Sequence, residues 1–363
     1  METIKTIRKP PIAMANILKD TKNLFLPLID KTHPKAAHIH FSFQTNGYPH
    51  LGTITSVMIA FRIGEMLHKL DISPQIEIEV LENAPAITKK INKKSYSLSF
   101  SDYFENEILI MDRYMDSFMQ LFEFLSEWSK VKYYLLYYDK FQSDPQVRKK
   151  LIFILKNYID FSNIFSPSDG IIRIRTKCPM CNYLNKDSTT VRIEKSNEAL
   201  VISSECYEHG RHSIILAENN DDFIDMNTAL RNVIKESVFI ENAKKEKALN
   251  IMVDGVDWVY IIPLIEQGLG LFNHSIKQLP IRVFAPLIID ETGAKFSKSI
   301  HMKSDVYSEI SNQIIKNMGR DISSYKNILT ALWEETGRWI KNPQLLFRNY
   351  SVSYFEQLFG GIR

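Results

Sequence analysis

Two short polar segments have the residue types that bind and neutralise nucleotide phosphates. The first runs from Asn46 to Thr53, with the sequence NGYPHLGT. His50 can donate a hydrogen bond to a phosphate oxygen as charge shifts in a transition state. Gly52 has no Cβ, so a flat group such as adenine can lie against the backbone there. For this segment alone, a turn in which His50 only caps a helix is an equally good interpretation.

The second polar segment runs from Asp290 to Ser299, with the sequence DETGAKFSKS. Lys295 and Lys298 lie three residues apart, and together with the loop serines they can surround a polyphosphate from the face opposite the first segment. Positioning and charge neutralisation are most of what nucleotidyl transfer requires. Taken alone, such a loop is usually a solvated basic turn, so the prediction depends on the two segments acting together.

All three cysteines lie in a pattern typical of a metal site. Cys178 and Cys181 form a C-x2-C pair, and Cys206 and His209 form a C-x2-H pair after a gap of 24 residues. Each pair can form a tight turn that presents two ligands to one tetrahedral ion, and a closed Cys3His set is typical of structural Zn²⁺. His212 is a competing fourth ligand, and free buried cysteines are the alternative interpretation.

Alternating strands and helices are expected to position these segments. Alternating or apolar stretches predict strands at 37–43, 75–81, 131–138, 249–254 and 281–289. Helical spacing predicts helices at 51–70, 103–129, 225–247 and 258–272, a helix capped by Ser143 with Pro145 in its first turn, and a helical tail. This alternation predicts an α/β fold with a Rossmann-like, doubly wound parallel sheet. Both polar segments follow a predicted strand, where open sheets of this kind bind ligands.

The expected domain organisation is one catalytic domain with an insertion. Residues 1–170 would form its first half and residues 216–300 its second half, which ends in the lysine-containing loop. Residues 171–215 contain the cysteines and short β-like stretches that suit the hairpins of a zinc ribbon, so they are expected to form a zinc-binding insertion. Residues 301–363 are expected to form a short helical C-terminal segment.

Composition is that of an ordinary soluble globular protein, with 45% hydrophobic and 24% charged residues. No apolar run is long enough to span a membrane, and the first residues lack the apolar core of a secretory signal. Three cysteines cannot form a closed disulfide framework. We therefore expect a cytoplasmic protein with no membrane partner. A net charge of +3 is too balanced to indicate nucleic-acid binding by itself.

Taken together, PHLGT after the first strand and KFSKS after the last strand resemble the HIGH and KMSKS signatures of class I aminoacyl-tRNA synthetases. Within that class, the sequence most resembles the class I lysyl-tRNA synthetases, from about residue 15 to about residue 300. Phe296 stands where the second signature usually has methionine. The resemblance implies a class I synthetase catalytic core that uses ATP, Mg²⁺ and an amino acid, with zinc in a structural role.

The resemblance also implies roles for individual residues. His50, Lys295 and Lys298 would be catalytic. Asp257 falls where the family has an active-site segment, so it would contact the ribose or the amino acid, although a helix N-cap is the alternative. The full set implied to bind ATP is Asn46, Gly47, Pro49, His50, Gly52, Thr53, Asp257, Lys295, Ser297, Lys298 and Ser299.

Two differences from the lysyl family affect the expected function. Only 64 residues follow Ser299, whereas the resemblance implies a large helical domain there that reads the anticodon. Residues 81–90 (LENAPAITKK) lack the family's run of aspartates, which weakens the case for lysine because a buried ammonium group needs paired negative charge.

We therefore expect ATP-dependent activation of lysine or a related amino acid to an aminoacyl adenylate, with a small-molecule nucleophile favoured as acceptor over tRNA. A compact lysyl-type enzyme that charges tRNA is the first alternative. An inactive synthetase-like regulatory or RNA-binding protein is the second. The sequence does not indicate the oligomeric state.

Overall fold

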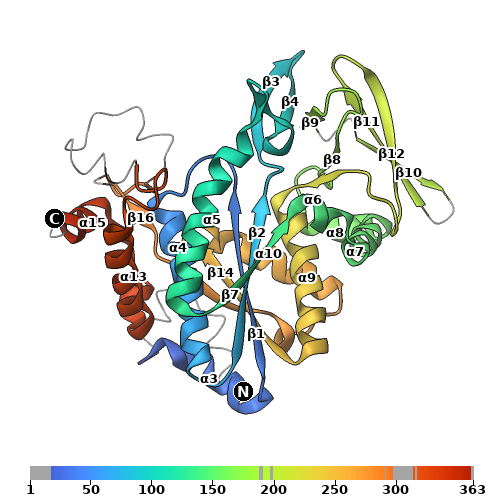
Figure 1. Ribbon diagram of the computed structural model, residues 1–363. Coiled ribbons are helices and arrows are strands. Elements are labelled where there is room, and N and C mark those ends of the chain that lie inside the picture. Colours follow the sequence, from blue (N-terminus) through green and yellow to red (C-terminus); the bar gives the residue numbers. More distant parts are fainter. Residues whose placement is uncertain are drawn as a thin grey trace.

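The fold is built on one parallel sheet with the strand order β15–β14–β1–β2–β7 (Figure 1). This computed structural model describes residues 18–187, 191–196, 199–290, 292–296, 314 and 317–360. The sheet strands are β1 (Ala36–Gln44), β2 (Ser73–Leu81), β7 (Lys132–Tyr137), β14 (Ala248–Gly255) and β15 (Ile281–Ala285). The chain adds β2 and β7 on one side of β1 and then β14 and β15 on the other. The predicted doubly wound α/β sheet is therefore confirmed, with its switch point between β1 and β14.

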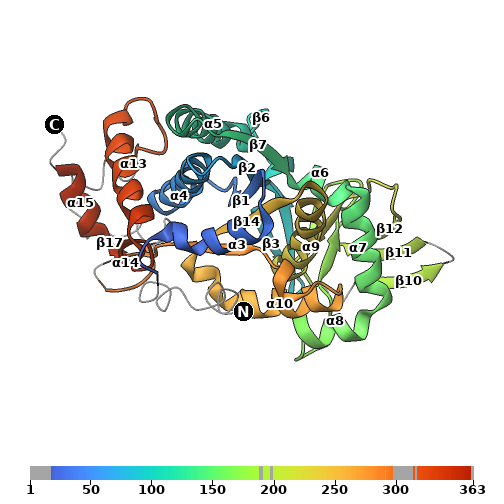
Figure 2. The same ribbon diagram turned by 90° about the horizontal axis from the view of Figure 1, so that it is seen from below.

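Helices cover both faces of the sheet (Figures 1 and 2). On one face lie α4 (Leu51–His68), α5 (Ile110–Ser129) and α13 (Lys326–Lys341), whose apolar side chains join those of the strands in one hydrophobic cluster. On the other face, α9 (Thr228–Glu246) and α10 (Ile262–Leu271) belong to a second cluster. Because both faces are covered, residues 37–41 of the central strand β1 are all buried, although His38 and His40 among them are polar. None of the helices described is long and apolar enough to cross a membrane.

The remaining elements are mostly short connections. The helical ones are η1 (Thr21–Leu24), α3 (Leu26–Thr32), η2 (Phe100–Asp102), α6 (Tyr138–Ser143), α7 (Pro145–Lys156), α8 (Tyr158–Phe165), η4 (Val256–Ile261), η5 (Ile276–Gln278), α14 (Pro343–Leu346) and α15 (Val352–Gly360). The strands are β3 (Pro85–Ile91), β4 (Lys94–Ser99), β5 (Phe104–Glu105), β6 (Ile108–Leu109), β8 (Ile174–Thr176), β9 (Leu184–Asn185), β10 (Arg192–Ser196), β11 (Ala199–Cys206), β12 (Gly210–Leu216), β13 (Ile224–Met226), β16 (Ile288–Ile289) and β17 (Tyr350–Ser351).

Two helix starts differ from the sequence-based expectation. The helix predicted at 103–129 begins only at Ile110, because β5 and β6 form a small hairpin whose turn residues Asn106 and Glu107 both have positive φ. Asp144, not Ser143, caps α7: its Oδ1 accepts hydrogen bonds from the next free backbone N–H groups, at 2.7 and 3.4 Å. Pro145 does occupy the first turn as expected, where its missing N–H costs little.

Three other predicted elements are shorter than expected. The segment 225–247 starts with β13, and its helix begins at Thr228 behind the N-cap Asn227. The segment 258–272 begins in the 3-10 helix η4 and becomes α-helical only at Ile262. The strand predicted at 281–289 breaks after Ala285, because Pro286 has no N–H to continue the pairing.

The cysteine-containing region packs against a hairpin from the first half of the chain. β10, β11 and β12 form an antiparallel sheet, while β9 pairs with β4 of the hairpin formed by β3 and β4. Lys94 on this hairpin forms an ion pair with Glu205 on β11, with 2.7 Å between Nζ and Oε2. Leu200 and Ile202 of β11 belong to the same hydrophobic cluster as α9 and α10. The region is thus joined to its surroundings on two sides.

The C-terminal helices pack against the α4 face of the sheet. The Arg62 guanidinium on α4 lies 3.7 Å from the centre of the Trp333 ring on α13, and Arg62 also donates hydrogen bonds to the Trp333 carbonyl. Further along α13, the fully buried Trp339 donates to Glu335 at 2.7 Å and stacks on Tyr350.

A close backbone contact joins the start of this C-terminal region to the NGYPHLGT segment. A Cβ placed on Gly319 would lie 1.8 Å from the carbonyl oxygen of Pro49, which no real side chain can tolerate. Beside this contact, the Arg320 guanidinium lies 5.6 Å from the centre of the Tyr48 ring. The position of the first polar segment therefore depends on glycine at residue 319.

We predict that Gly319→Ala lowers the free energy of unfolding by about 1–3 kcal/mol, since the added methyl group forces Pro49 and the C-terminal region apart. Chemical denaturation measures this change. Gly270→Ala is the matched control, because a Cβ on that α10 residue meets no atom within 4 Å; it should leave stability unchanged or raise it by up to about 1 kcal/mol. Equal stability of both variants and the unaltered protein would contradict the contact.

Candidate active site

A cavity of about 300 Å³ lies at the carboxyl ends of β1 and β14. Its wall includes the last residues of both strands, so it occupies the switch point of the sheet, where doubly wound sheets bind ligands. The predicted site residues that line it are Asn46, Gly47, His50, Gly52, Thr53, Asp257 and Lys295. The structure therefore brings together residues from the two polar segments, which lie more than two hundred residues apart in the sequence.

His50 both lines the cavity and caps α4. It is the N-cap residue, its Nδ1 accepts a hydrogen bond from the Thr53 N–H at 3.4 Å, and its Nε2 lies 3.0 Å from Thr53 Oγ1. The capping interpretation is therefore correct, and it does not exclude a binding role. A Cβ on Gly52 would lie 3.2 Å from the His50 ring, so glycine leaves room for this ring position. The start of α4 places its positive dipole end beside the cavity.

Four predicted residues of the two segments do not lie on the described cavity wall. Pro49 is buried next to Gly319 and is absent from the described cavity wall. It therefore helps to position the segment. Ser297, Lys298 and Ser299 lie outside the described residues.

A tight turn places Lys295 at the cavity. The Asp290 Oδ1 atom accepts hydrogen bonds from the backbone N–H groups of Thr292 and Ala294, at 2.9 and 3.1 Å. Gly293 has a φ of 83°, which favours glycine in this turn. The Phe296 N–H then donates to the Ile288 carbonyl at 2.8 Å, and its ring packs against the main hydrophobic cluster.

Asp257 forms an ion pair with Lys295, and both residues line the cavity; 2.5 Å separates Oδ2 from Nζ. It lies in the first turn of η4, whose N-cap is Gly255, so the N-cap interpretation of Asp257 is wrong. A Cβ on Gly255 would lie 2.5 Å from Asp257 Oδ1, so glycine leaves room for this position of the carboxylate. Both side chains are partly exposed, at 29% and 52%, and such pairs contribute little stability, so an incoming phosphate can displace the carboxylate.

The inner wall of the cavity was not predicted from the sequence. Thr228, Arg231, Asn232 and Lys235 line it from α9. Their spacing puts them on one face of the helix. These four polar residues recur at helical spacing in the sequence, but the stretch 225–247 was predicted only to be a helix.

Most of the charged groups on this wall are paired. Lys235 Nζ donates to Glu79 Oε2 at 3.0 Å, and Arg282 donates to Glu236 at 2.5 Å; all four side chains are buried. Asp254 Oδ2 lies 3.9 Å from Arg282 Nη1. Burial raises the pKa of the Asp254 carboxyl, while the positive charges of Lys235 and Arg282 act in the opposite direction.

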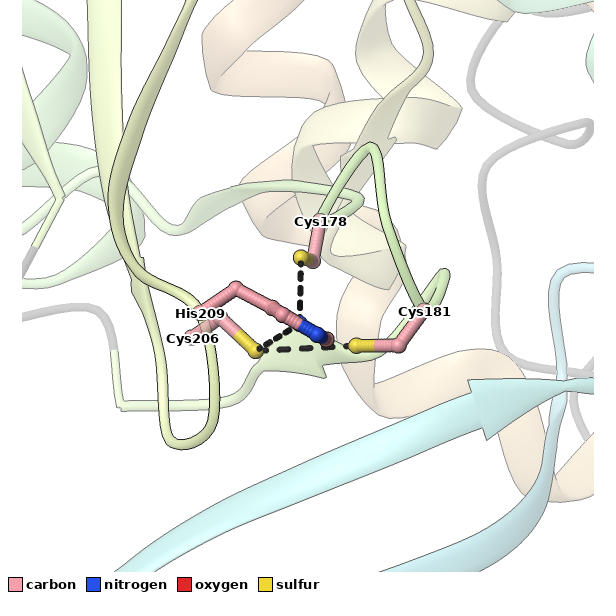
Figure 3. Close-up of side chains that lie close together, drawn as sticks. All are labelled: Cys178, Cys181, Cys206 and His209. Atoms are coloured by element: carbon pink, nitrogen blue, oxygen red, sulfur yellow. Dashed lines mark hydrogen bonds between the residues drawn. The ribbon is translucent and has the colours of Figure 1, made fainter.

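The predicted metal ligands converge at a second place, outside the cavity (Figure 3). One pair, Cys178 and Cys181, lies on the turn between β8 and β9. The other, Cys206 and His209, lies on the turn between β11 and β12. The ligand atoms of all four lie within 4.8 Å of one another. His212 instead lies 3.2 Å from Thr176 Oγ1, so His209 and not His212 completes the cluster.

The dimensions of this cluster suit a zinc ion. The Cys178 Sγ–His209 Nδ1, Cys181 Sγ–Cys206 Sγ and Cys206 Sγ–His209 Nδ1 distances are 3.5, 3.5 and 3.6 Å. The edges of a tetrahedron around Zn²⁺, with Zn–S bonds of about 2.3 Å and Zn–N bonds of about 2.0 Å, have about these lengths. Four protein ligands leave no open position, so a zinc ion here would be structural.

The cluster also contacts the β3–β4 hairpin. Lys89 Nζ lies 3.4 Å from the hydroxyl of Tyr207, a residue of the second ligand turn, and 4.8 Å from the centre of the Tyr183 ring. The Tyr96 ring packs edge-on against Tyr207, with 5.1 Å between ring centres. An ordered cluster therefore supports the neighbouring hairpin.

No protein-family model and no curated protein matches the sequence. The structure is similar to a Campylobacter jejuni protein described as an arginyl-tRNA synthetase (10% identity, 89% of this chain and 66% of that chain, TM-score 0.38). It is also similar to the glutamate-tRNA synthetase of Elizabethkingia anophelis (10% identity, 90% of this chain and 71% of that chain, TM-score 0.41). The arginyl-tRNA synthetase of Thermus thermophilus is similar as well (11% identity, 98% of this chain and 71% of that chain, TM-score 0.41). The chain spans about two thirds of the length of these structures. The likeness concerns the general fold, so the roles of individual residues depend on the geometry of the site.

We expect one zinc ion per chain in freshly purified protein. Cys178→Ser should reduce the zinc content from about one ion per chain to near zero and lower the melting temperature, because metal binding and local folding are coupled. Metal analysis and a thermal melt measure these two effects. Met180→Ser, an exposed change between two ligands, is the matched control and should keep the ion. A zinc-free preparation of the unaltered protein would contradict this expectation.

Proposed function

We propose that this protein activates an amino acid with ATP to form an aminoacyl adenylate, as class I aminoacyl-tRNA synthetases do. The observation that carries the proposal is the meeting of His50 and Lys295 on one cavity at the β1–β14 switch point. The positive end of α4 and the cation of Lys295 both line that cavity, which suits the binding of a polyphosphate there. The structural similarity to synthetases is consistent with this proposal.

The chemistry needs positioning and charge stabilisation only. The amino-acid carboxylate attacks the α-phosphorus of ATP, the bond to the bridging oxygen of the β-phosphate breaks, and pyrophosphate leaves. His50 would donate a hydrogen bond to the α-phosphate region, and Lys295 and Lys298 would neutralise the leaving group. Mg²⁺ would enter with ATP and would help to neutralise the charge of its phosphates. No side chain has to form a covalent intermediate.

The other predicted contacts follow from the same arrangement. Gly52 would let the adenine approach the backbone, and Asp257, once Lys295 turns to phosphate, would be released to accept a hydrogen bond from the ribose. The remaining residues of the proposed ATP site are Asn46, Gly47, Pro49, Thr53, Ser297 and Ser299. The zinc ion would hold the region beside the β3–β4 hairpin in place and take no part in the reaction.

The second half-reaction transfers the aminoacyl group to a nucleophile and releases AMP. The preference for a small-molecule acceptor over tRNA stays a prediction from the sequence.

We predict that His50→Ala and Lys298→Ala each lower adenylate formation by about 10²-fold or more, the usual cost of one lost transition-state donor. Amino-acid-dependent exchange of labelled pyrophosphate into ATP measures this step. His68→Ala is the matched control, since it removes an exposed histidine from the other end of the same helix. It should keep full exchange.

Near-normal exchange by both active-site variants would contradict the assignment of the cavity as the ATP site. A second arm follows transfer from preformed enzyme-bound adenylate, with total tRNA or with small amines added. Efficient charging of one group of tRNA isoacceptors would show that tRNA is the acceptor, contrary to the prediction from the sequence.

A further inference from the structure

We propose that the inner wall of the cavity binds a negatively charged side chain, so that the amino acid activated here is an acidic one and not lysine. This inference rests on the proposed adenylate-forming function, because it names the substrate class of the same cavity.

The key observation is an unpaired buried cation. Arg231 lines the cavity and is only 9% exposed. Its Nε is buried without a hydrogen-bond partner, and its side chain forms no ion pair within the described ranges of the chain. The centre of the Tyr138 ring lies 6.0 Å from its guanidinium carbon, at the limit of a cation–π contact. A buried guanidinium without a partner is costly, so its retention indicates an anionic ligand.

Lys235 and Glu236, the other charged residues that α9 contributes to the wall, already have partners. Lys235 is paired with Glu79, and Arg282 is paired with Glu236. A lysine substrate would need free carboxylates for its side-chain ammonium group, and these two glutamates are engaged by buried cations. Among the residues that the structure describes, the wall therefore has an unpaired cation for an anionic group and no pair of unengaged carboxylates for a cationic one.

The Asp254 carboxylate is available to bind the α-amino group that every amino-acid substrate carries. It lines the same cavity, and its one charged neighbour among the described ion pairs, Arg282, is 3.9 Å away and better paired with Glu236. An amino acid with its ammonium group at Asp254 and its side-chain carboxylate at Arg231 would leave the α-carboxylate free to reach ATP.

The helix that carries Arg231 adds a second source of positive potential. α9 begins at Thr228, so its first turn and its positive dipole end lie at the cavity. The Thr228 hydroxyl and the Asn232 amide, one turn away on the same face, can donate further hydrogen bonds. α9 covers the face of the sheet opposite α4, the helix proposed to bind phosphate (Figure 1). The two helix starts therefore serve two different anions.

The test measures pyrophosphate exchange with glutamate, aspartate, their amides glutamine and asparagine, and lysine. The unaltered protein should prefer an acid over its amide by about 10²-fold or more, because the amide leaves the guanidinium unpaired. Arg231→Gln should reduce that preference to about tenfold or less, because exchange with the acid falls while exchange with the amide is unchanged. Arg231→Lys should retain part of the preference, and Arg192→Gln, an exposed change on β10, should retain all of it.

Three results would overturn the inference while leaving adenylate formation intact. In the first, the unaltered protein prefers lysine or a neutral amino acid. In the second, Arg231→Gln lowers exchange equally with every amino acid. In the third, Arg231→Gln keeps the full preference for the acid over its amide. The second result would assign Arg231 to the α-carboxylate. If no amino acid supports exchange, the proposed function fails. In that case, calorimetric titration with glutamate and with aspartate tests the anion site independently of adenylate formation. Binding of either amino acid that Arg231→Gln abolishes supports the anion site. Failure of the unaltered protein to bind both amino acids overturns it.

Discussion

The reversal of strand order between β1 and β14 is the constraint on which the proposed chemistry depends. Because the chain winds outward on both sides of this point, no connection crosses the carboxyl ends of these two strands, and a cavity forms there. α4 leaves from β1 and α9 leads into β14, so both helices begin at the same edge of the sheet, one on each face. The positive ends of two helices thus point toward one cavity without any special loop.

Glycines and a buried backbone contact fix the outer wall of this cavity. Gly52 makes room for the His50 ring, and Gly255 makes room for the Asp257 carboxylate. The contact of Gly319 with Pro49 then links the first polar segment to the region that packs on α4 through Arg62 and the helix α13. The C-terminal helices are therefore part of the framework of the site, even though they contribute no residue to the described cavity wall.

The sequence predicted the doubly wound sheet because its strands and helices alternate with clear periodicity, and it predicted the outer cavity wall because short motifs follow strand ends. The cysteine spacing predicted the four clustered ligands for the same local reason. What it could not predict depends on packing between distant segments. The ion pair between Asp257 and Lys295 and the pairing of Lys235 with Glu79 join residues far apart in the chain. Only the spatial arrangement shows that Arg231 has no ion-pair partner among the residues that the structure describes.

The most direct measurement of the central claim is hydrogen–deuterium exchange of the unaltered protein with and without saturating Mg·ATP. One nucleotide site at the switch point requires that two distant peptides, 44–56 around the start of α4 and 252–262 after β14, become protected together. Protection of both, with no change in the zinc-ligand turns at 178–181 and 206–209, is the predicted result. Protection of only one of the two peptides, or protection confined to another part of the chain, would contradict the account.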